Sequence, residues 1–241
     1  QFLIFVKIMG LKNLIFISIS LPWNTKKNLE LKNKIVEAYS DHVLEHEKEP
    51  KSVFNFCKNN GIEESDFYKH FSSLEHIKES IFVQFFDNAF SLISKEKDFE
   101  TQSPKEKLLS FYYTFFEVLL LNRSYVLFVL SSSKNKMQQL MSLKSLRSSF
   151  KQFASTLIEQ GNMHKQSRFT KHPEALFSEG AWVQLLFLLK FWLEDKSAGF
   201  EKTDMAIEKS VQTVFELFDN TPLDSIIDFG KFLWKENFKM T

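Results

Sequence analysis

Apolar residues recur at helical spacing almost everywhere from residue 26 onward, and this periodicity is the strongest constraint on the fold. The clearest case predicts an amphipathic helix over 28–47 from apolar residues that stand four apart, Leu31, Ile35, Tyr39 and Val43. The 241 residues include only six glycines and five prolines, too few for the frequent turns of a β-sandwich or barrel. We therefore predict an all-α protein with nine or ten helices.

Local start and stop signals divide this pattern into helices. Ser52 is the expected N-cap of a short helix that ends at Gly61. Ser103-Pro104-Lys105-Glu106 combines an N-cap, a proline at the first helical position and a capping-box acid. Further helices are expected over 104–121, 123–130, 138–160 with an end at Gly161, from Pro173 to about 195, and from Thr203 and Thr221-Pro222. The polar stretch 96–103 is the expected boundary between a domain of residues 26–98 and one of residues 99–241.

The first residues differ from the rest of the chain. Residues 1–23 are apolar but interrupted by Lys7 and Lys12, whereas a transmembrane helix needs roughly 20 apolar residues with few charges. The longest uninterrupted run, 14–21, has only the length of a signal-peptide core, and no small-residue cleavage site follows it. We interpret residues 1–25 as an atypical leader outside the fold, with a signal or anchor as the alternative.

Charge and cysteine content exclude several classes of protein. With 31 basic and 30 acidic residues, the chain lacks the broad positive field of a protein that coats nucleic acid. The single cysteine, Cys57, excludes an internal disulfide and a cysteine-based zinc cage, and suits a reducing, cytoplasmic location. His42-Val43-Leu44-Glu45-His46 matches the H-x-x-E-H zinc pattern, but no third ligand is identifiable. Without a nucleophile elbow or a phosphate loop, we expect no enzyme activity, no cofactor and no metal site.

Two short helices around a glycine turn form a helix-turn-helix pattern, and specific residues give it a family likeness. Residues 30–82 resemble the N-terminal domain of TetR-family regulators through Ser52-Val53, Cys57-Lys58-Asn59-Asn60-Gly61-Ile62, Phe67-Tyr68-Lys69-His70-Phe71 and Glu75. Residues 104–238 are similar to a C-terminal domain found beside this N-terminus in Bacteroidetes proteins, through Asn122-Arg123-Ser124-Tyr125-Val126-Leu127-Phe128 and Asp228-Phe229-Gly230-Lys231-Phe232-Leu233. The resemblance implies a three-helix DNA-binding domain followed by a helical domain that binds ligand and dimerises.

The residues expected to contact DNA lie in and around the second helix of this unit. They are Ser52, Glu64, Ser65, Tyr68, Lys69 and His70. Over 51–71, however, three lysines are balanced by Glu63, Glu64 and Asp66, and no arginine is present. Carboxylates oppose phosphate contacts, although a glutamate can accept a hydrogen bond from cytosine N4.

The second domain offers a ligand pocket and a basic region as candidate sites. The expected pocket-lining residues are aromatic: Phe111, Phe115, Phe116, Trp182, Phe187 and Phe191, with Trp192 as a further candidate; core packing is the alternative for each. Residues 181–195 are apolar on nearly all sides, which predicts a central helix, a dimer interface, or both. Residues 131–171 carry a formal charge of +7, which suits an anionic ligand or partner as well as a solvated face.

Two functional hypotheses follow from these features. In the first, the chain is a dimeric transcriptional regulator in which a small apolar ligand changes the spacing of two DNA-reading helices. In the second, it is a lipid-binding protein of TetR fold that does not bind DNA, similar in plan to a mitochondrial ubiquinone-biosynthesis protein. The second rests on residues 222–238, where an apolar face with Trp234 lies beside a lysine row, as in helices that lie on membranes.

Overall fold

The computed structural model describes residues 23–131, 136–163 and 174–220, and within these ranges it contains helices and no strand. This confirms the predicted all-α class. Residues 1–22 of the predicted leader lie outside the described residues. Residues 23–25 of that leader belong instead to the first helix, which begins at Trp23. The predicted helix over 222–238 also lies outside the described residues.

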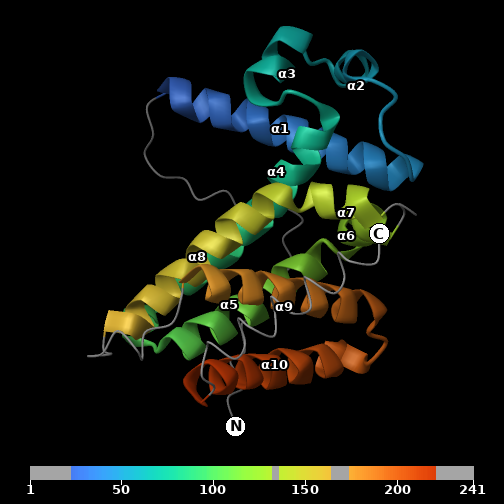
Figure 1. Ribbon diagram of the computed structural model, residues 1–241. Helices are drawn as coiled ribbons and strands as arrows, with labels where there is room; N and C mark the ends of the chain where they lie inside the picture. Colours follow the sequence, from blue (N-terminus) through green and yellow to red (C-terminus); the bar gives the residue numbers. More distant parts are fainter. Residues whose placement is uncertain (1–22, 132–135, 164–173, 221–241) are drawn as a thin grey trace, which may run out of the picture.

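The N-terminal part consists of α1 (Trp23–His46), α2 (Val53–Asn60), α3 (Glu64–His70) and α4 (Leu74–Ile93). Helices α1, α2 and α3 form the upper part of the molecule, and α4 runs from them into the lower part (Figure 1). Side-chain caps fix two of the helix starts: Ser52 Oγ accepts from Asn55 N at 3.2 Å, and Ser73 Oγ accepts from His76 N at 3.1 Å. Gly61 ends α2 at a φ of 61°, a left-handed conformation that residues with a side chain rarely adopt.

The C-terminal part begins with a 3₁₀ turn (Phe99–Thr101) and continues through six helices. They are α5 (Pro104–Leu121), α6 (Arg123–Ser131), α7 (Lys136–Ser142), α8 (Lys144–Met163), α9 (Glu174–Glu194) and α10 (Glu201–Asn220), the last preceded by a second 3₁₀ turn (Ala198–Phe200). Helix α8 packs along α4 and against α9, while α5 packs against α4, α8 and α10, and α10 also contacts α9 (Figure 1). Helices α5 and α6 meet at 91°, which turns α6 back toward α1.

The predicted start of α5 is confirmed in detail. Ser103 Oγ accepts from Glu106 N at 3.3 Å, and Ser103 N donates to Glu106 Oε2 at 2.8 Å, which completes the capping box. The hydrogen bonds from the Ser103 side chain and backbone lower the pKa of Glu106. This local sequence signal therefore marks the entrance to the C-terminal helices.

One predicted helix was wrong in its extent. The expected single helix over 138–160 is divided into α7 and α8 at Leu143, whose N–H donates to Leu140 O at 3.1 Å, a bond that tightens the turn. Gly161 was expected to end this helix but lies inside α8, because it lacks the positive φ that Gly61 has.

The hydrophobic core is continuous between the two parts of the molecule. Helix α4 connects them, because its apolar side chains contact α1 at one end and α5 and α8 along the rest of its length. Tyr125 of α6 joins the same region, with its ring 6.5 Å from Phe82 and 6.4 Å from Phe85 of α4. A displacement of α4 or α6 would therefore change their contacts with α1.

Candidate nucleic-acid interface and helical core

The turn between α2 and α3 is held by aromatic side chains that point inward. The Phe56 and Phe67 rings lie 6.1 Å apart in an edge-to-face arrangement, and Tyr39 of α1 packs on Phe56 at 6.2 Å. Phe71 lies 6.0 Å from Phe67 and is also buried. This packing fixes α3 on α1 and leaves the opposite face of α3 in solvent.

Three of the six predicted DNA-contacting residues lie on that exposed face. Ser65, Tyr68 and Lys69 are exposed, and Tyr68 retains 54% of its surface although its ring touches Phe67. The aromatic pair of the family likeness thus has two roles, since Phe67 is buried and Tyr68 faces solvent.

The other three predicted residues are less available. Ser52 uses its hydroxyl oxygen to cap α2, and Glu64 and His70 are half-buried. Burial lowers the pKa of His70, as does the charge of Lys32 on α1, and its Nε2 is buried without a hydrogen-bond partner in the described part of the chain. The structure therefore brings together a smaller set of candidate contacts than the sequence suggested.

Lysine residues near this face are partly engaged with other groups. Lys69 Nζ lies 2.6 Å from Asp66 Oδ1, one turn earlier in α3. Lys58 of α2 lies 6.0 Å from the ring centre of Phe54, which is 59% exposed. Phe54 was not among the residues predicted to contact DNA, and its exposure in the folded structure distinguishes it from the buried Phe56 and Cys57 of the same helix.

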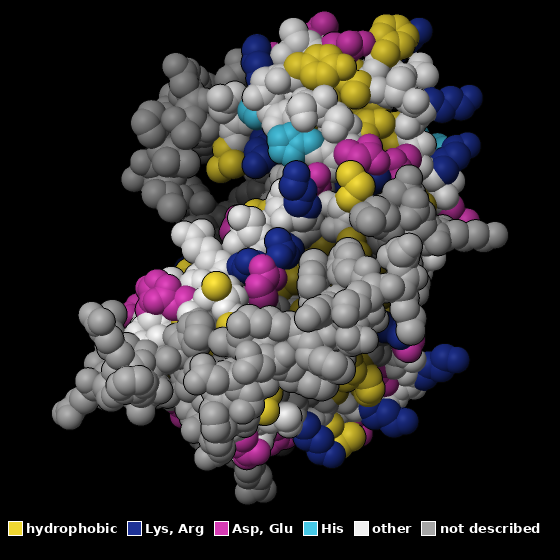
Figure 2. All heavy atoms as spheres, viewed as in Figure 1, with side chains coloured by type: hydrophobic (Ala, Val, Ile, Leu, Met, Phe, Trp, Pro, Cys, Tyr) yellow, Lys and Arg dark blue, Asp and Glu magenta, His cyan; other side chains and the backbone are white. Residues whose placement is uncertain are grey.

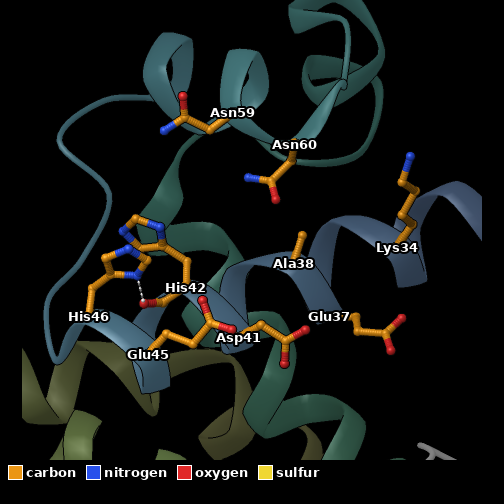
Figure 3. Close-up of a pocket in the computed structure, with 9 residues that line it drawn as sticks. All are labelled: Lys34, Glu37, Ala38, Asp41, His42, Glu45, His46, Asn59 and Asn60. Atoms are coloured by element: carbon orange, nitrogen blue, oxygen red, sulfur yellow. Dashed lines mark hydrogen bonds between the residues drawn. The ribbon is translucent and has the colours of Figure 1, made fainter.

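A hollow of about 530 Å³ lies between α1 and α2 (Figure 3). Apart from Ala38, its lining is polar: Lys34, Glu37, Asp41, His42, Glu45, His46, Asn59 and Asn60. The His42 and His46 rings stack at 4.4 Å, and His46 Nδ1 lies 3.0 Å from His42 O. Burial lowers the pKa of His42, and the neighbouring His46 and Lys48 lower it further.

The histidine pair of the H-x-x-E-H pattern therefore lies at one end of this hollow. Among the described residues, no group of three His, Cys, Asp or Glu side chains is arranged to hold a metal ion. The hollow thus provides polar groups beside α2 but not a built metal centre in the part of the chain that the structure describes.

Four of the predicted pocket-lining residues form a packed aromatic core in the C-terminal part. Phe111 stacks on Phe115 at 5.4 Å and lies 5.5 Å from Phe150 of α8, which in turn is 6.4 Å from Trp182 of α9. Phe116 lies 6.0 Å from Trp192, the further candidate. These five candidates are buried, so a ligand among them must displace side chains that now touch one another.

The remaining two candidates lie elsewhere. Phe187 is 53% exposed on α9 and pairs with the half-buried Phe191 at 6.2 Å. Val183, one turn before Phe187, is 64% exposed. Helix α9 therefore buries one side in the core and presents an apolar strip on the other, as the sequence pattern indicated.

A polar network crosses the apolar core and joins three helices. The Tyr112 hydroxyl of α5 lies 3.3 Å from Ala181 O and 3.3 Å from Gln184 Oε1 of α9. Gln184 Nε2 then donates to Ser210 Oγ of α10 at 2.9 Å. Most buried polar groups in proteins have hydrogen-bond partners, and here these bonds fix the relative positions of α5, α9 and α10.

Arg123 holds the bend between α5 and α6 against the end of α9. Its guanidinium lies 4.3 Å from the ring centre of Trp192 and 4.6 Å from that of Phe200, and it contacts the carbonyl oxygens of Trp192 and Leu193 at 3.4 and 3.5 Å. A cation at a helix C-terminus is favourable because the last carbonyl groups carry partial negative charge. Arg123 was noticed in the sequence only as part of a family likeness.

The predicted basic region is partly neutralised where the structure describes it. Arg147 Nη2 lies 2.8 Å from both carboxylate oxygens of Glu179 on α9, and Lys151 pairs with the same carboxylate. Hydrogen bonds from Lys151 and Arg147 lower the pKa of Glu179 against the effect of burial. Residues 132–135 and 164–173 of this region lie outside the described part.

Helix α9 also meets the length and composition of a membrane-spanning helix, as does the α5–α6 pair if its 91° bend is counted as one span. Half of the apolar window of α9 is buried inside the protein, which is typical of a core helix.

In a comparison with known protein families, residues 107–233 match the family of tetracyclin repressor-like C-terminal domains. No curated protein sequence matches the chain.

The solved structures that resemble the protein include three from bacteria. A putative TetR-family transcriptional regulator from Syntrophomonas wolfei str. Goettingen shares 19% identity at a TM-score of 0.58, over 79% of this chain and 96% of that one. The fatty acid degradation regulator FadR from Bacillus halodurans shares 16% identity at a TM-score of 0.47, over 78% and 94%. A putative TetR-family regulator from Shewanella sp. PV-4 shares 16% identity at 0.45, over 79% and 96%. The first likeness shows the fold, and because the domain match covers more than half of its residues, the chain belongs to the TetR family of transcriptional regulators.

Proposed function

We propose that the protein is a homodimeric, ligand-responsive transcriptional regulator that binds operator DNA through α2 and α3. The observation that carries this proposal is the exposed face of α3, where Ser65, Tyr68 and Lys69 follow the left-handed turn at Gly61. A helix presented in this way fits the major groove, where hydroxyl groups contact bases or phosphates and a lysine contacts phosphate. The protein would act in the cytoplasm, without an enzymatic activity of its own.

Dimerisation is supported by the apolar strip on α9. Val183 and Phe187 stand one turn apart and are each more than half exposed, and Met205 of α10 is also exposed. Pairing of this strip with that of a second copy would bury it and present two α3 helices. A two-fold dimer of this kind binds half-sites separated by about 34 Å, one turn of DNA.

Ligand response is supported by the aromatic core and by its connection to the N-terminal helices. A small apolar ligand that enters between α5, α8 and α9 must displace packed rings such as Phe111 and Phe150. Because α4 packs on α5 and α8, and α6 packs on α1, such a displacement would reach the DNA-binding helices. A ligand that favours one arrangement would then change the affinity for operator DNA.

The first experiment is a titration of the purified full-length chain with duplexes from the region flanking its own gene, at low salt. We expect retardation or an anisotropy change that weakens as salt rises, since phosphate contacts release counterions. Absence of binding to every duplex by a folded dimer would overturn the DNA-binding part of the proposal.

The acidic surroundings of α3 favour a second candidate, a lipid-binding protein of the same fold. Glu63, Glu64 and Asp66 stand at the start of α3, where DNA phosphates would lie. Residues 222–238 supply the apolar and lysine pattern that such a protein needs at a membrane surface. Flotation with anionic liposomes tests this candidate: binding should fall in Trp234→Glu, and unchanged flotation would remove the support from this segment.

A further inference from the structure

Lys69 is the only basic residue of α3 besides His70 at its end, and it is paired within its own helix. Its Nζ lies 2.6 Å from Asp66 Oδ1, a charge-assisted hydrogen bond between residues three apart. Both side chains reach solvent, with 63% of Lys69 and 36% of Asp66 exposed. The positive charge that the exposed face of α3 offers to phosphate is therefore already paired with a carboxylate.

The rest of the N-terminal part does not compensate for this pairing. Residues 23–93, which span α1 to α4, contain nine lysines, no arginine and twelve aspartates and glutamates, so their formal charge is −3. Lys78 of α4 is already paired with Glu49 and Glu75. Acidic and basic side chains alternate over the upper part of the molecule, without a continuous basic surface on the face in view (Figure 2).

This charge distribution acts most strongly on non-specific binding. Proteins bind DNA of any sequence through lysine and arginine contacts to phosphate, and this contribution is independent of base sequence. A phosphate that approaches α3 must replace Asp66 as the partner of Lys69, and it is also repelled by the Asp66 carboxylate. Exposed ion pairs are weak enough for such an exchange when base contacts add to it.

We propose that Asp66, by pairing with Lys69, determines specificity: it suppresses binding to non-specific DNA and leaves operator DNA to be selected by its base contacts. This inference rests on the proposed DNA-binding function and adds a regulatory contact within the reading helix. It predicts an unusually small salt dependence for the wild-type protein. It also predicts that removal of one carboxylate increases affinity chiefly for the wrong DNA.

The test compares the full-length wild type with Asp66→Asn, which keeps the size of the side chain and removes its charge. Anisotropy titrations use two duplexes, one from the region flanking the gene and one of the same composition in scrambled order. For the scrambled duplex at low salt, we expect Asp66→Asn to bind about three- to tenfold tighter, with the slope of log affinity against log salt steeper by about one. The ratio of affinities for the two duplexes should fall.

Two further variants separate the ion pair from a general charge effect. Glu63→Gln also removes one carboxylate beside α3 but leaves the Asp66–Lys69 pair intact, so its salt slope should stay that of the wild type. Addition of Lys69→Gln to Asp66→Asn should restore the wild-type slope. Asp66→Ser gives the same readout if circular dichroism shows that the asparagine variant is misfolded.

The outcomes distinguish this inference from the proposed function. Wild-type binding to the flanking duplex with an unchanged slope in Asp66→Asn would overturn the inference and leave the proposed function standing. An equal steepening in Glu63→Gln would also overturn it, because the effect would then be general charge removal. Failure of wild type and Asp66→Asn alike to bind either duplex would overturn the proposed function itself.

Discussion

Lys78 of α4 donates from Nζ to Glu49 Oε1 at 2.9 Å and so ties the connection between α1 and α2 to a helix 29 residues further along the chain. The same ammonium group bonds Glu75 Oε1 at 2.7 Å. Lys78 itself is almost fully buried, whereas both carboxylates reach solvent. Since Glu49 lies three residues before the N-cap Ser52, this contact sets the position of α2 relative to α4.

Replacement of Lys78 by methionine should lower the free energy of unfolding by about 1–2 kcal/mol, because two charge-assisted hydrogen bonds are lost while the freed carboxylates can be hydrated. Chemical denaturation at fixed protein concentration measures this loss. Lys95→Met, at an exposed site after α4, serves as the control and should be close to neutral. Equal stability of Lys78→Met and the wild type would show that the contact does not hold the connection.

The pH dependence of this contact has a defined sign. Burial lowers the pKa of Lys78, but hydrogen bonds with Glu75 and Glu49 outweigh it and raise the pKa above its ordinary value. The stabilisation is therefore fully present below the unfolded-state pKa, about 10.4, and is lost only as pH rises through the folded-state pKa. The difference in stability between Lys78→Met and the wild type should stay constant from neutral pH to about pH 10.

Two buried tyrosines provide a matched pair of variants. The Tyr112 hydroxyl contacts Ala181 O and Gln184 Oε1, whereas the buried Tyr125 hydroxyl has no hydrogen-bond partner in the described part of the chain. Tyr112→Phe should destabilise the protein by about 1–2 kcal/mol, and Tyr125→Phe should be neutral or slightly stabilising. Urea denaturation of both variants measures the difference, and an equal loss in both would contradict it.

Much of the fold could be predicted because local signals and helical periodicity agree with the final packing. The Ser103–Glu106 capping box and the Gly61 turn act over a few residues, and both are found as expected. The split at Leu143 and the continuation of α8 through Gly161 were missed. Periodicity does not register a one-residue tightening of a helix, and a glycine ends a helix only when its surroundings favour a positive φ.

The candidate sites were less predictable because they depend on which face of a helix is buried. All the aromatic residues of α5 and α9 fit a pocket by type, but packing places Phe111 in the core and Phe187 on the outside. Likewise, the likeness at Phe67-Tyr68-Lys69-His70 does not say that His70 turns inward or that Lys69 pairs with Asp66. Phe111 is buried by contacts with Phe86 of α4 and Phe150 of α8, and His70 lies near Lys32 of α1. Such contacts between helices distant in sequence are not visible in the local pattern.

The hydrogen bonds of Asp195 should make the stability of the protein depend on pH in acid. Its Oδ1 accepts from Ser197 N at 2.8 Å and its Oδ2 accepts from Thr203 N at 3.0 Å, which fixes the turn between α9 and α10. Although burial raises the pKa of Asp195, these hydrogen bonds lower it to about 2. The stabilisation is present above the unfolded-state pKa, about 3.9, and is lost as pH falls through the folded-state value.

Asp195→Asn should therefore be less stable than the wild type at pH 7, and the two should converge as pH falls from about 4 to 2. Thermal unfolding followed by circular dichroism over this range measures the convergence. Glu194→Gln, an exposed neighbour, is the control. A constant difference between Asp195→Asn and the wild type down to pH 2 would exclude the carboxylate as its source.

A variant of Phe187 tests the proposed dimer most directly, because this residue belongs to the exposed strip of α9 and its ring contacts that of Phe191, outside the aromatic core around Phe111. A charge at this position must be desolvated when two copies pair, so Phe187→Glu should raise the dimer dissociation constant by at least about thirtyfold.

The folded protomer of this variant should keep its helical content, since the Phe187 side chain is already more than half exposed. Sedimentation equilibrium measures the dissociation constant. Leu121→Glu is the control, since Leu121 is an apolar residue at the end of α5 that is more exposed than Phe187. If Leu121→Glu dissociates the dimer and Phe187→Glu does not, the subunits pair through another face. Because DNA half-sites are contacted by two α3 helices at once, Phe187→Glu should also weaken operator binding while leaving Lys69 and Asp66 paired as in the wild type.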